Sequence, residues 1–559
     1  MNGSKRIWSL AGVALVIALV AGFWFGRPAY RRYKETRAMK QAQAALAKDD
    51  YRSAALSLRV ALALNPSNVT ATRLMADLFD RGQSPAALGW RRRVCELEPS
   101  LDNKILFASC ALRYEKAPFP IAAQALEAAH PLAETNTAYH LVASQLALKL
   151  NCLPDAETHL ESAARLEPTN RLYQLNLATL RLQSTDTNAA AGARRELAAL
   201  ASDPGLALPA LRSLTADGVA RRDVPAAEDY SRRLQAHPQA TFEDSLLRLT
   251  VLREGQSADL GEPLAGVQRE CATNSLKVAQ AVSWMRGHGL ARAALDWTAT
   301  LPATTRGTMP VPLAEAECCV SLADWAGLQE RLVGRRWEDQ EFLRLAFLAR
   351  ALREQGKRDG ASASWRLALS AASKRAELLL VLLQATRAWG WEDETTDVLW
   401  AIAGRARSED WPLQSLMRAC AAKDDSAGLY RVYQALLERH PESAALKNNV
   451  ATLGLLLGRD LARAQALARE VYDAGKTNAM LVSTYAFALH AQGKGAEGLK
   501  LMQAFPESDL QRPEVALYYA VLLAAAGERN QAKPYLAAAE KGRPLPEERR
   551  LLDQARRGR

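Results

Sequence analysis

The sequence predicts an all-α protein in which pairs of helices repeat along the chain to form a solenoid. The 559 residues are rich in Ala and Leu, and only 6% are aromatic. This composition favours helices, because Ala and Leu lose little conformational entropy in them. Small residues, leucines and prolines also recur at a fixed spacing. Apolar residues make up 49% of the chain and charged residues 24%, which is typical of a folded chain and not of a disordered one.

Residues 1–6 form a short N-terminal tail, and the segment that follows is predicted to cross a membrane. No charged residue lies between Ile7 and Phe25. A helix of that length spans about 28 Å, close to the hydrocarbon thickness of a bilayer. We therefore expect a transmembrane helix over residues 7–26. A cleaved signal peptide is the alternative, but it would have a shorter apolar run and a small-residue cleavage site.

Basic residues follow this span in the juxtamembrane segment 27–40, which leads into the first repeat. They are opposed only by Glu35, and they suit the anionic surface of a membrane. The positive-inside rule then places the repeats in the cytoplasm, most simply at a bacterial inner membrane, with the periplasm as the alternative. The net charge of +11 would also suit nucleic acid. No nucleic-acid partner is expected, because the sequence shows no recognisable binding module.

A spacing of small residues, leucine and proline recurs along the chain. It occurs at Ala54, Ala61, Leu64 and Pro66, and again at Ala156, Ala163, Leu166 and Pro168. Each such segment follows another helical stretch across a turn. Small residues allow two helices to approach closely, and Pro just past the second helix ends it. The repeated unit is therefore predicted to be helix, turn, helix and break.

This pattern resembles the tetratricopeptide repeat, which has a unit of 34 residues. The last repeat carries Ala520, Gly527, Ala532 and Ala539 at the family's small-residue and turn positions. The resemblance implies about twelve to fifteen helix pairs stacked as a right-handed superhelix. The repeats are expected to begin near residues 35, 69, 103, 137, 171, 207, 241, 275, 309, 342, 376, 410, 445, 479 and 513.

The strength of this resemblance divides the chain into blocks. Residues 35–240 are expected to form an N-terminal block of tetratricopeptide repeats, and residues 342–546 a C-terminal block. Residues 241–341 are expected to hold divergent helical repeats, in which the period persists but the motif does not. The basic, amphipathic tail 547–559 is expected to cap the last repeat, because a solenoid must shield its terminal apolar face.

Two motifs could suggest chemistry, and both favour a structural interpretation. Gly493, Gly495 and Gly498 match a dinucleotide-binding pattern, but a helical stretch precedes them where that site needs a strand. Cys318 and Cys319 are adjacent, and free cysteines of this kind usually pack as small buried apolar residues. The chain has seven cysteines, an odd number without the spacing of a disulfide framework. We expect no metal, no cofactor and no catalytic residue.

Clusters of charged residues are expected to lie in turns, at helix starts or on solvated helix faces, and not in a catalytic site. Asp49 and Asp50, and likewise Asp424 and Asp425, fall in predicted turns, where Asp commonly begins a helix. The run Arg91–Arg93 is expected to lie on a solvated helix face.

The resemblance implies that the first helix of each repeat lines a concave face and that a few of its positions contact a partner. The candidate partner-binding residues at these positions are Arg73, Asp77, Asp80, Phe107, Tyr114, Phe487 and His490. In the last two repeats the same positions also include Met480, Ser483 and Glu514. A helix or an extended segment with apolar anchors is the expected ligand.

These observations predict a membrane-anchored scaffold or adaptor that binds other proteins, in envelope assembly, export or polymer secretion. Two alternatives stay open: an enzyme with a cryptic site in the divergent middle repeats, and a solenoid that associates with itself as a structural element. No segment breaks the helical period with clustered titratable residues. We therefore expect neither enzymatic activity nor a small-molecule substrate.

Overall fold

The computed structural model describes residues 27–557, and their regular secondary structure is entirely helical. Two earlier predictions, the tail 1–6 and the transmembrane helix 7–26, lie outside the described residues. Within the described range no helix is both long enough and apolar enough to span a bilayer. The chain divides into two compact units, one ending at Cys271 and one beginning at Ala272.

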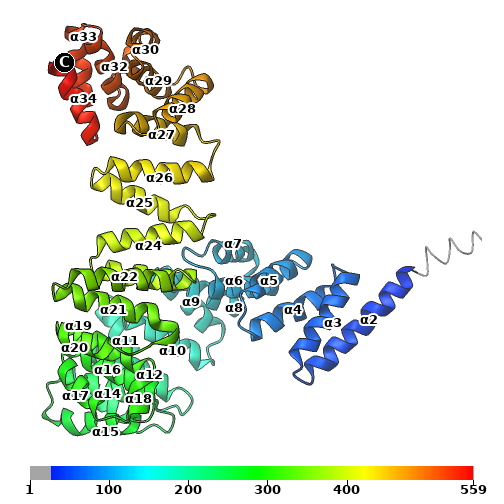
Figure 1. The fold of residues 1–559 in the computed structure, drawn as a ribbon. Helices are drawn as coiled ribbons and strands as arrows, with labels where there is room; N and C mark the ends of the chain where they lie inside the picture. Colours follow the sequence, from blue (N-terminus) through cyan, green and yellow to red (C-terminus); the bar gives the residue numbers. More distant parts are fainter. Residues whose placement is uncertain (1–26, 558–559) are drawn as a thin grey trace, which may run out of the picture. The chain divides into compact units, whose positions relative to one another are not determined.

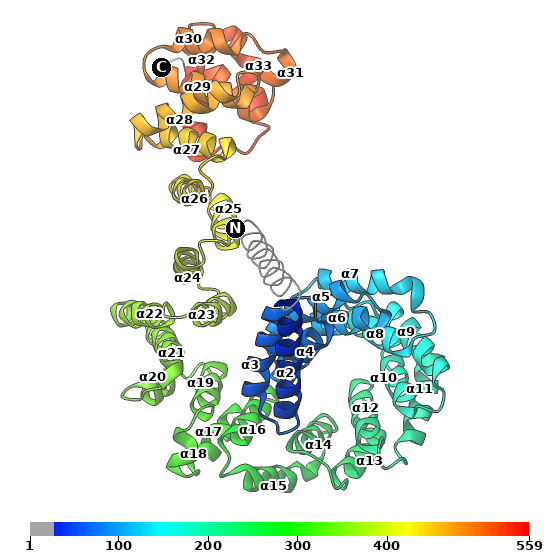
Figure 2. The same ribbon diagram turned by 90° about the vertical axis from the view of Figure 1, so that its right-hand side faces the viewer.

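The N-terminal unit contains seven helical hairpins (Figures 1 and 2). The first helices of these hairpins are α2 (Arg27–Leu46), α4 (Val69–Arg81), α6 (Leu101–Tyr114), α8 (Thr137–Lys149), α10 (Arg171–Arg181), α12 (Ala207–Ala220) and α14 (Phe242–Glu254). The second helices are α3 (Tyr51–Leu64), α5 (Ala86–Leu97), α7 (Pro120–Ala129), α9 (Leu153–Leu166), α11 (Thr187–Leu200), α13 (Val224–Gln235) and α15 (Gly261–Cys271). The 3-10 turns are η2 (His130–Leu132) and η3 (Ala258–Leu260).

The C-terminal unit contains eight hairpins, and Figure 2 shows them following one another along the chain. The first helices are α16 (Ser275–Gly287), α19 (Val311–Ser321), α21 (Glu341–Glu354), α23 (Ala376–Ala388), α25 (Trp411–Ala422), α27 (Ala444–Leu457), α29 (Ala479–Ala491) and α32 (Pro513–Ala525). The second helices are α17 (Ala291–Ala299), α20 (Trp325–Leu332), α22 (Arg358–Ala372), α24 (Glu392–Arg405), α26 (Ser426–Arg439), α28 (Leu461–Ala474), α30 (Gly495–Met502) and α33 (Arg529–Ala539). The remaining helices are α18 (Ala303–Gly307), η4 (Glu338–Gln340), α31 (Glu507–Leu510) and α34 (Pro546–Arg557).

The described residues thus form fifteen hairpins, which confirms the predicted architecture of repeated helix pairs. The first helices of all hairpins but the first begin within two residues of the predicted repeat starts. The exception is α2, which already begins at Arg27, where residue 35 was expected. The boundary between the two units along the chain falls inside the segment 241–341 that was predicted to be divergent. The predicted block boundaries at residues 240 and 342, and the hand of the superhelix, stay predictions.

The small residues of the repeat lie where its helices cross. Ala54, Ala61, Ala156 and Ala163 have no exposed surface, as their recurring spacing predicted. The approach is closest in α29 and α30, where a Cβ atom added to Gly498 would lie 2.6 Å from the carbonyl oxygen of Ala486. These positions require small side chains because the helix backbones themselves are in contact.

The turn inside a hairpin has a recurrent geometry. A residue of positive φ lies just past the end of the first helix. The N–H group of the residue after it donates to the carbonyl oxygen five residues earlier, as in a Schellman motif. Gly356 has φ +76°, and the Lys357 N–H lies 2.9 Å from the Leu352 carbonyl oxygen. Asp424 has φ +53°, and Asp425 then caps the next helix. The predicted turn and N-cap places of this aspartate pair are therefore confirmed.

The two adjacent cysteines take packing positions, as predicted. Cys318 and Cys319 on α19 have no exposed surface. Burial raises the pKa of the Cys318 thiol to about 12 and also raises the pKa of Cys319. Both side chains are therefore neutral at physiological pH and behave as small apolar residues. All seven cysteines are free thiols.

Candidate functional site

The seven candidate partner-binding residues fall on three first helices. Arg73, Asp77 and Asp80 lie on α4, and the aromatic residues Phe107 and Tyr114 lie on α6. These five belong to the N-terminal unit. The other two, Phe487 and His490, lie on α29 of the C-terminal unit.

The two acidic candidates hold a buried arginine and so contribute to packing between helices. Arg91 on α5 is only 8% exposed. Its Nη2 lies 2.7 Å from Asp77 Oδ1 and 2.6 Å from Asp80 Oδ2. Asp80 Oδ1 also lies 3.6 Å from the Cys110 sulfur on α6. The expectation that Arg91–Arg93 is a solvated face is therefore wrong at Arg91, because two carboxylates on the preceding helix bind this side chain.

The remaining candidates of the N-terminal unit are more accessible. The Arg73 side chain is about half exposed and forms an ion pair with Glu98. Phe107 is half-buried against the core of α6 and α7, and the Arg92 guanidinium lies 5.9 Å from its ring centre. The Tyr114 hydroxyl is buried without a hydrogen-bond partner among residues 27–557. All three residues are partly buried, and Arg73 keeps part of its side chain open to a partner.

The two candidates on α29 differ in accessibility. Phe487 is 6% exposed, and its ring lies 5.0 Å from that of Tyr518 on α32. This side chain belongs to the core between successive hairpins. His490 is half-buried, and the loss of solvent lowers its imidazole pKa. His490 therefore has the larger surface of the two to offer a partner.

The C-terminal helix α34 returns along the chain and packs on first helices of the preceding repeats. It lies beside α32 in Figure 1 and also contacts α27. The Tyr518 hydroxyl donates to Glu548 Oε1 at 2.9 Å, and the Leu545 N–H donates to Glu548 Oε2 at 2.8 Å. Leu552 is buried in the same core as α32. The face of α27 and α32 that receives α34 is called the C-terminal groove below.

Helix α34 and the segment that leads into it also contact the hairpin of α25 and α26, which lies far earlier in the sequence. Arg549 Nη2 lies 2.9 Å from Asp424 Oδ2, and Arg543 Nη2 lies 3.6 Å from Asp424 Oδ1. The Ser426 hydroxyl donates to the Glu547 carboxylate. The tail was predicted to cap the last repeat. It packs on α32, the first helix of the last hairpin, and the capping role itself stays a prediction. Its return to residues more than a hundred positions earlier was not predicted.

A cavity of about 200 Å³ remains in the C-terminal groove beside α34. Its wall combines apolar and polar side chains, and it includes Asn448, which is 5% exposed and whose Oδ1 has no hydrogen-bond partner among residues 27–557. Met480, Ser483 and Glu514, which were predicted to face a groove, line it. The full lining is Leu429, Tyr433, Asn448, Asn449, Thr452, Leu453, Leu456, Met480, Ser483, Thr484, Glu514, Tyr518, Leu545 and Glu548.

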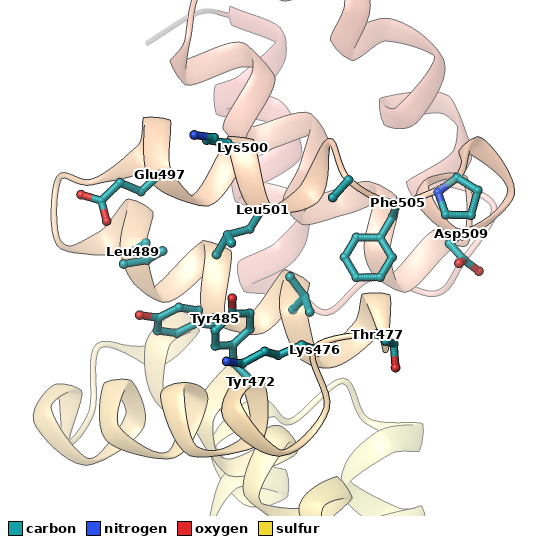
Figure 3. Close-up of a pocket in the computed structure, with 13 residues that line it drawn as sticks. Tyr472, Lys476, Thr477, Tyr485, Leu489, Glu497, Lys500, Leu501, Phe505 and Asp509 are labelled. Atoms are coloured by element: carbon teal, nitrogen blue, oxygen red, sulfur yellow. The ribbon is translucent and has the colours of Figure 1, made fainter.

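A second, more open pocket of about 790 Å³ lies among α28, α29, α30 and α31, and it is shown in Figure 3. Two stacked tyrosine rings lie in it, Tyr472 and Tyr485, with ring centres 4.6 Å apart. The Lys476 amine lies 5.4 Å from the Tyr472 ring centre, a cation–π arrangement. Leu501 and Phe505 approach from the opposite wall in the figure. We call this the Tyr472 pocket.

The Tyr472 pocket presents both charges around an aromatic centre. Lys476, Lys500 and Glu497 are exposed at its rim, and Asp509 is half-buried. Such a surface can hold a peptide that combines an apolar side chain with a charged neighbour. Among residues 27–557 no three His, Cys, Asp or Glu side chains gather as a metal site requires.

Neither the Tyr472 pocket nor the return of α34 was predicted from the sequence. A signal for the pocket was present, because Tyr472 ends one predicted repeat and Tyr485 begins the next, and stacking of neighbouring repeats brings these positions together. No local signal indicated the contact of Arg549 with Asp424, since it joins residues far apart in the sequence.

No family model matches the chain, and no curated protein matches it. Among solved structures it is similar to a chain of the APC/C hetero-tetramer Cut9–Hcn1, with TM-score 0.28 and 13% identity, covering 93% of this chain and 96% of that one. A tetratricopeptide repeat protein from Parabacteroides merdae gives TM-score 0.23 and 15% identity over 44% of this chain and 97% of that one.

A third similar structure, Naa15/Naa10 bound to HypK-THB, gives TM-score 0.25 and 13% identity over 94% of this chain and 78% of that one. The hairpins themselves establish the fold. Their number, their period and the small residues at their crossings identify a tetratricopeptide-like helical-repeat solenoid.

Proposed function

We propose that this chain is a membrane-anchored scaffold that binds other proteins through its helical repeats. The observation that carries the proposal is the C-terminal groove, which already holds a helix, α34, by a buried leucine and charged hydrogen bonds. A surface with these contacts is suited to an amphipathic helix laid in a groove. The Tyr472 pocket offers a second place for a peptide side chain.

The proposed anchor is the uncharged segment 7–26, which precedes the described residues. The adjoining part of α2 supports it, because Arg31, Arg32, Lys34 and Arg37 are all exposed. Exposed cations here would favour an anionic lipid surface. Confinement to a membrane would raise the effective concentration of any membrane-bound partner. We place the repeats in the cytoplasm at a bacterial inner membrane, serving envelope assembly, export or polymer secretion, without an enzymatic step.

The experiment that tests this proposal is site-specific photo-cross-linking of the full chain in native membranes. A photoreactive residue replaces Asn449 in the C-terminal groove, Tyr485 in the Tyr472 pocket, or Leu367, an exposed residue of α22 that serves as control. Mass spectrometry should identify one reproducible partner from Asn449 or Tyr485 and not from Leu367. Recovery of the chain alone from every position would contradict a scaffold, and recovery from the soluble fraction would contradict the anchor.

A further inference from the structure

Helix α34 is held in the C-terminal groove by few buried contacts. Of its twelve residues only Leu552 is buried. Its ion pairs are largely open to solvent, since the side chains of Arg549 and Asp424 are 52% and 26% exposed. The pair of Arg556 with Glu540 is about half exposed at both residues. Exposed pairs of this kind contribute little to stability, so a competing helix could replace α34.

One buried polar atom of the C-terminal groove has no hydrogen-bond partner among residues 27–557, even though α34 occupies the groove. Asn448 on α27 is more than nine-tenths buried, and its Oδ1 lacks a hydrogen-bond partner among the described residues. It lines the cavity of about 200 Å³ beside α34, together with Thr452 and Ser483. A buried acceptor without a donor is costly. A ligand with a donor group at this point would relieve that cost, which α34 does not.

We infer that the C-terminal groove is a binding site for an amphipathic helix of a partner protein, and that α34 is its displaceable occupant. This inference rests on the proposed scaffold function and specifies the partner. The partner helix would share the pattern of α34. Carboxylates in its first turn would face Ser426 and the Tyr518 hydroxyl, as Glu547 and Glu548 do.

The rest of the pattern follows from the same contacts. A leucine four residues after the second carboxylate would take the place of Leu552 in the core. An arginine between them would face Asp424, as Arg549 does. A long polar side chain with an N–H donor, absent from α34 at this point, would reach Asn448 Oδ1. This last feature would let the partner helix bind more tightly than α34.

The first test measures how fast α34 opens in the unmodified full chain. In hydrogen-exchange mass spectrometry, amides of α34 should exchange faster than those of α32 and α33, because a displaceable helix opens without the rest of the core. Equal protection of the three helices would show that α34 is an integral cap, and this result would overturn the inference.

The second test measures binding in trans, with a fluorescent peptide of residues 543–557 as the probe. The wild-type chain should bind it weakly, because its own α34 fills the groove. Leu552→Asp in the full chain should release α34 and tighten apparent binding by at least about tenfold, since apparent affinity scales with the fraction of open sites. The matched control is Arg550→Ala, because Arg550 is exposed and makes no ion pair or hydrogen bond within the described range. It should bind as the wild type does.

Specificity for the groove is tested by a substitution in the groove wall. In the Leu552→Asp chain, Tyr518→Phe removes the hydroxyl that donates a hydrogen bond to Glu548. Peptide binding should therefore weaken several-fold while the helical circular dichroism stays unchanged. A Leu552→Asp chain that binds the peptide no better than wild type would overturn the inference. Light scattering that shows Leu552→Asp chains pairing, with affinity for the peptide lost, would instead assign the groove to a second copy and overturn the partner-helix assignment.

Failure of this inference can be told from failure of the scaffold proposal. A partner cross-linked at Tyr485 but no peptide binding in the groove would leave the scaffold standing and remove the groove's role. Peptide binding without any partner recovered from membranes would leave α34 as a displaceable occupant of the groove and would remove the scaffold proposal.

Discussion

The two units build the same hairpin turn with different residues. In the C-terminal unit the residue of positive φ is usually glycine: Gly289, Gly356, Gly390, Gly458, Gly493 and Gly527, with Ala323 and Asp424 as exceptions. Within residues 27–271 the same turn occurs in five hairpins, and none of its positive-φ residues is glycine: Asp49, Gln83, Asn151, Arg222 and Gln256. The left-handed backbone is disfavoured for residues with a Cβ atom. The hairpin geometry therefore dictates this conformation, and the N-terminal unit adopts it against local preference.

The units also differ in what holds neighbouring hairpins together. One buried cluster in the C-terminal unit runs from Ala451 to Leu552 across several hairpins. The N-terminal unit has several separate clusters, and between them lie ion pairs with a buried member. Arg212 Nε lies 2.7 Å from Asp244, whose side chain is 3% exposed, on the next first helix. A polar contact thus joins two successive first helices in that unit.

The largest effect is expected when the most buried of these ion pairs is broken. Arg91→Leu leaves Asp80, 18% exposed, with only the more distant Arg113, whose Nη1 lies 3.7 Å from Asp80 Oδ1. The N-terminal unit should lose about 3 kcal/mol of stability, because a buried charge that has lost its nearest partner is costly. Hydrogen exchange of α4–α6 peptides measures this loss. Arg93→Leu is the control, since the Arg93–Glu96 pair is about half exposed on both sides, and it should cost less than about 0.5 kcal/mol.

The apolar crossings of the C-terminal unit offer the matching test. Gly498→Ala places a methyl group 2.6 Å from the Ala486 carbonyl oxygen, and it should destabilise the unit by about 2 kcal/mol through overpacking. Gly404→Ala, in α24, meets no atom within 4 Å. It should stabilise the chain by about 0.5–1 kcal/mol, because alanine restricts the unfolded chain. Thermal unfolding of both variants should show opposite signs, and shifts in the same direction would contradict the close crossing.

These contrasts explain how far the sequence predicts this molecule. The period, the repeat starts and the buried alanines are local features, so Ala156 and Ala163 could be placed from spacing alone. The groove positions Met480 and Ser483 could be placed for the same reason. Phe487 shares their helix, but its burial depends on Tyr518 in the next repeat.

Other features depend on contacts that spacing does not encode. Arg91 looks like part of a charged surface until Asp77 and Asp80 are placed beside it. The docking of α34 joins Arg549 to Asp424, 125 residues away. Contacts of such sequence separation leave no periodic signal, because a solenoid ordinarily contacts only its neighbours.

The turn comparison itself predicts a reciprocal pair of smaller effects. Gly356 has φ +76°, so Gly356→Ala should destabilise the C-terminal unit by about 1 kcal/mol. Gln83 has φ +48° and an exposed side chain, so Gln83→Gly should stabilise the N-terminal unit by about 0.5 kcal/mol. Denaturant unfolding of each variant, followed by hydrogen exchange in each unit, measures both. A stabilising Gly356→Ala would mean that the hairpin turn does not impose the left-handed conformation.

The smallest effect is a dependence of one polar crossing on pH. His140 Nδ1 lies 3.1 Å from His159 Nδ1, between α8 and α9, and His140 Nε2 lies 3.1 Å from the Glu134 carbonyl oxygen. That carbonyl can only accept, so His140 donates to it through Nε2. The two Nδ1 atoms share one hydrogen bond, so one of them donates and the other accepts. Burial lowers the pKa of His159, and the neighbouring His140 lowers it further.

The sign of the effect follows from that lowered pKa. In the unfolded chain His159 takes up a proton near pH 6.5, whereas in the folded hairpin it does so only at lower pH. Stability of the α8–α9 hairpin should therefore fall as pH drops below about 6.5 and stop falling below the folded pKa. Hydrogen exchange of α8 and α9, corrected for the intrinsic pH dependence of exchange, measures this change against His159→Gln. The variant cannot titrate at this position, so an equal pH dependence in both chains would assign the effect to other groups.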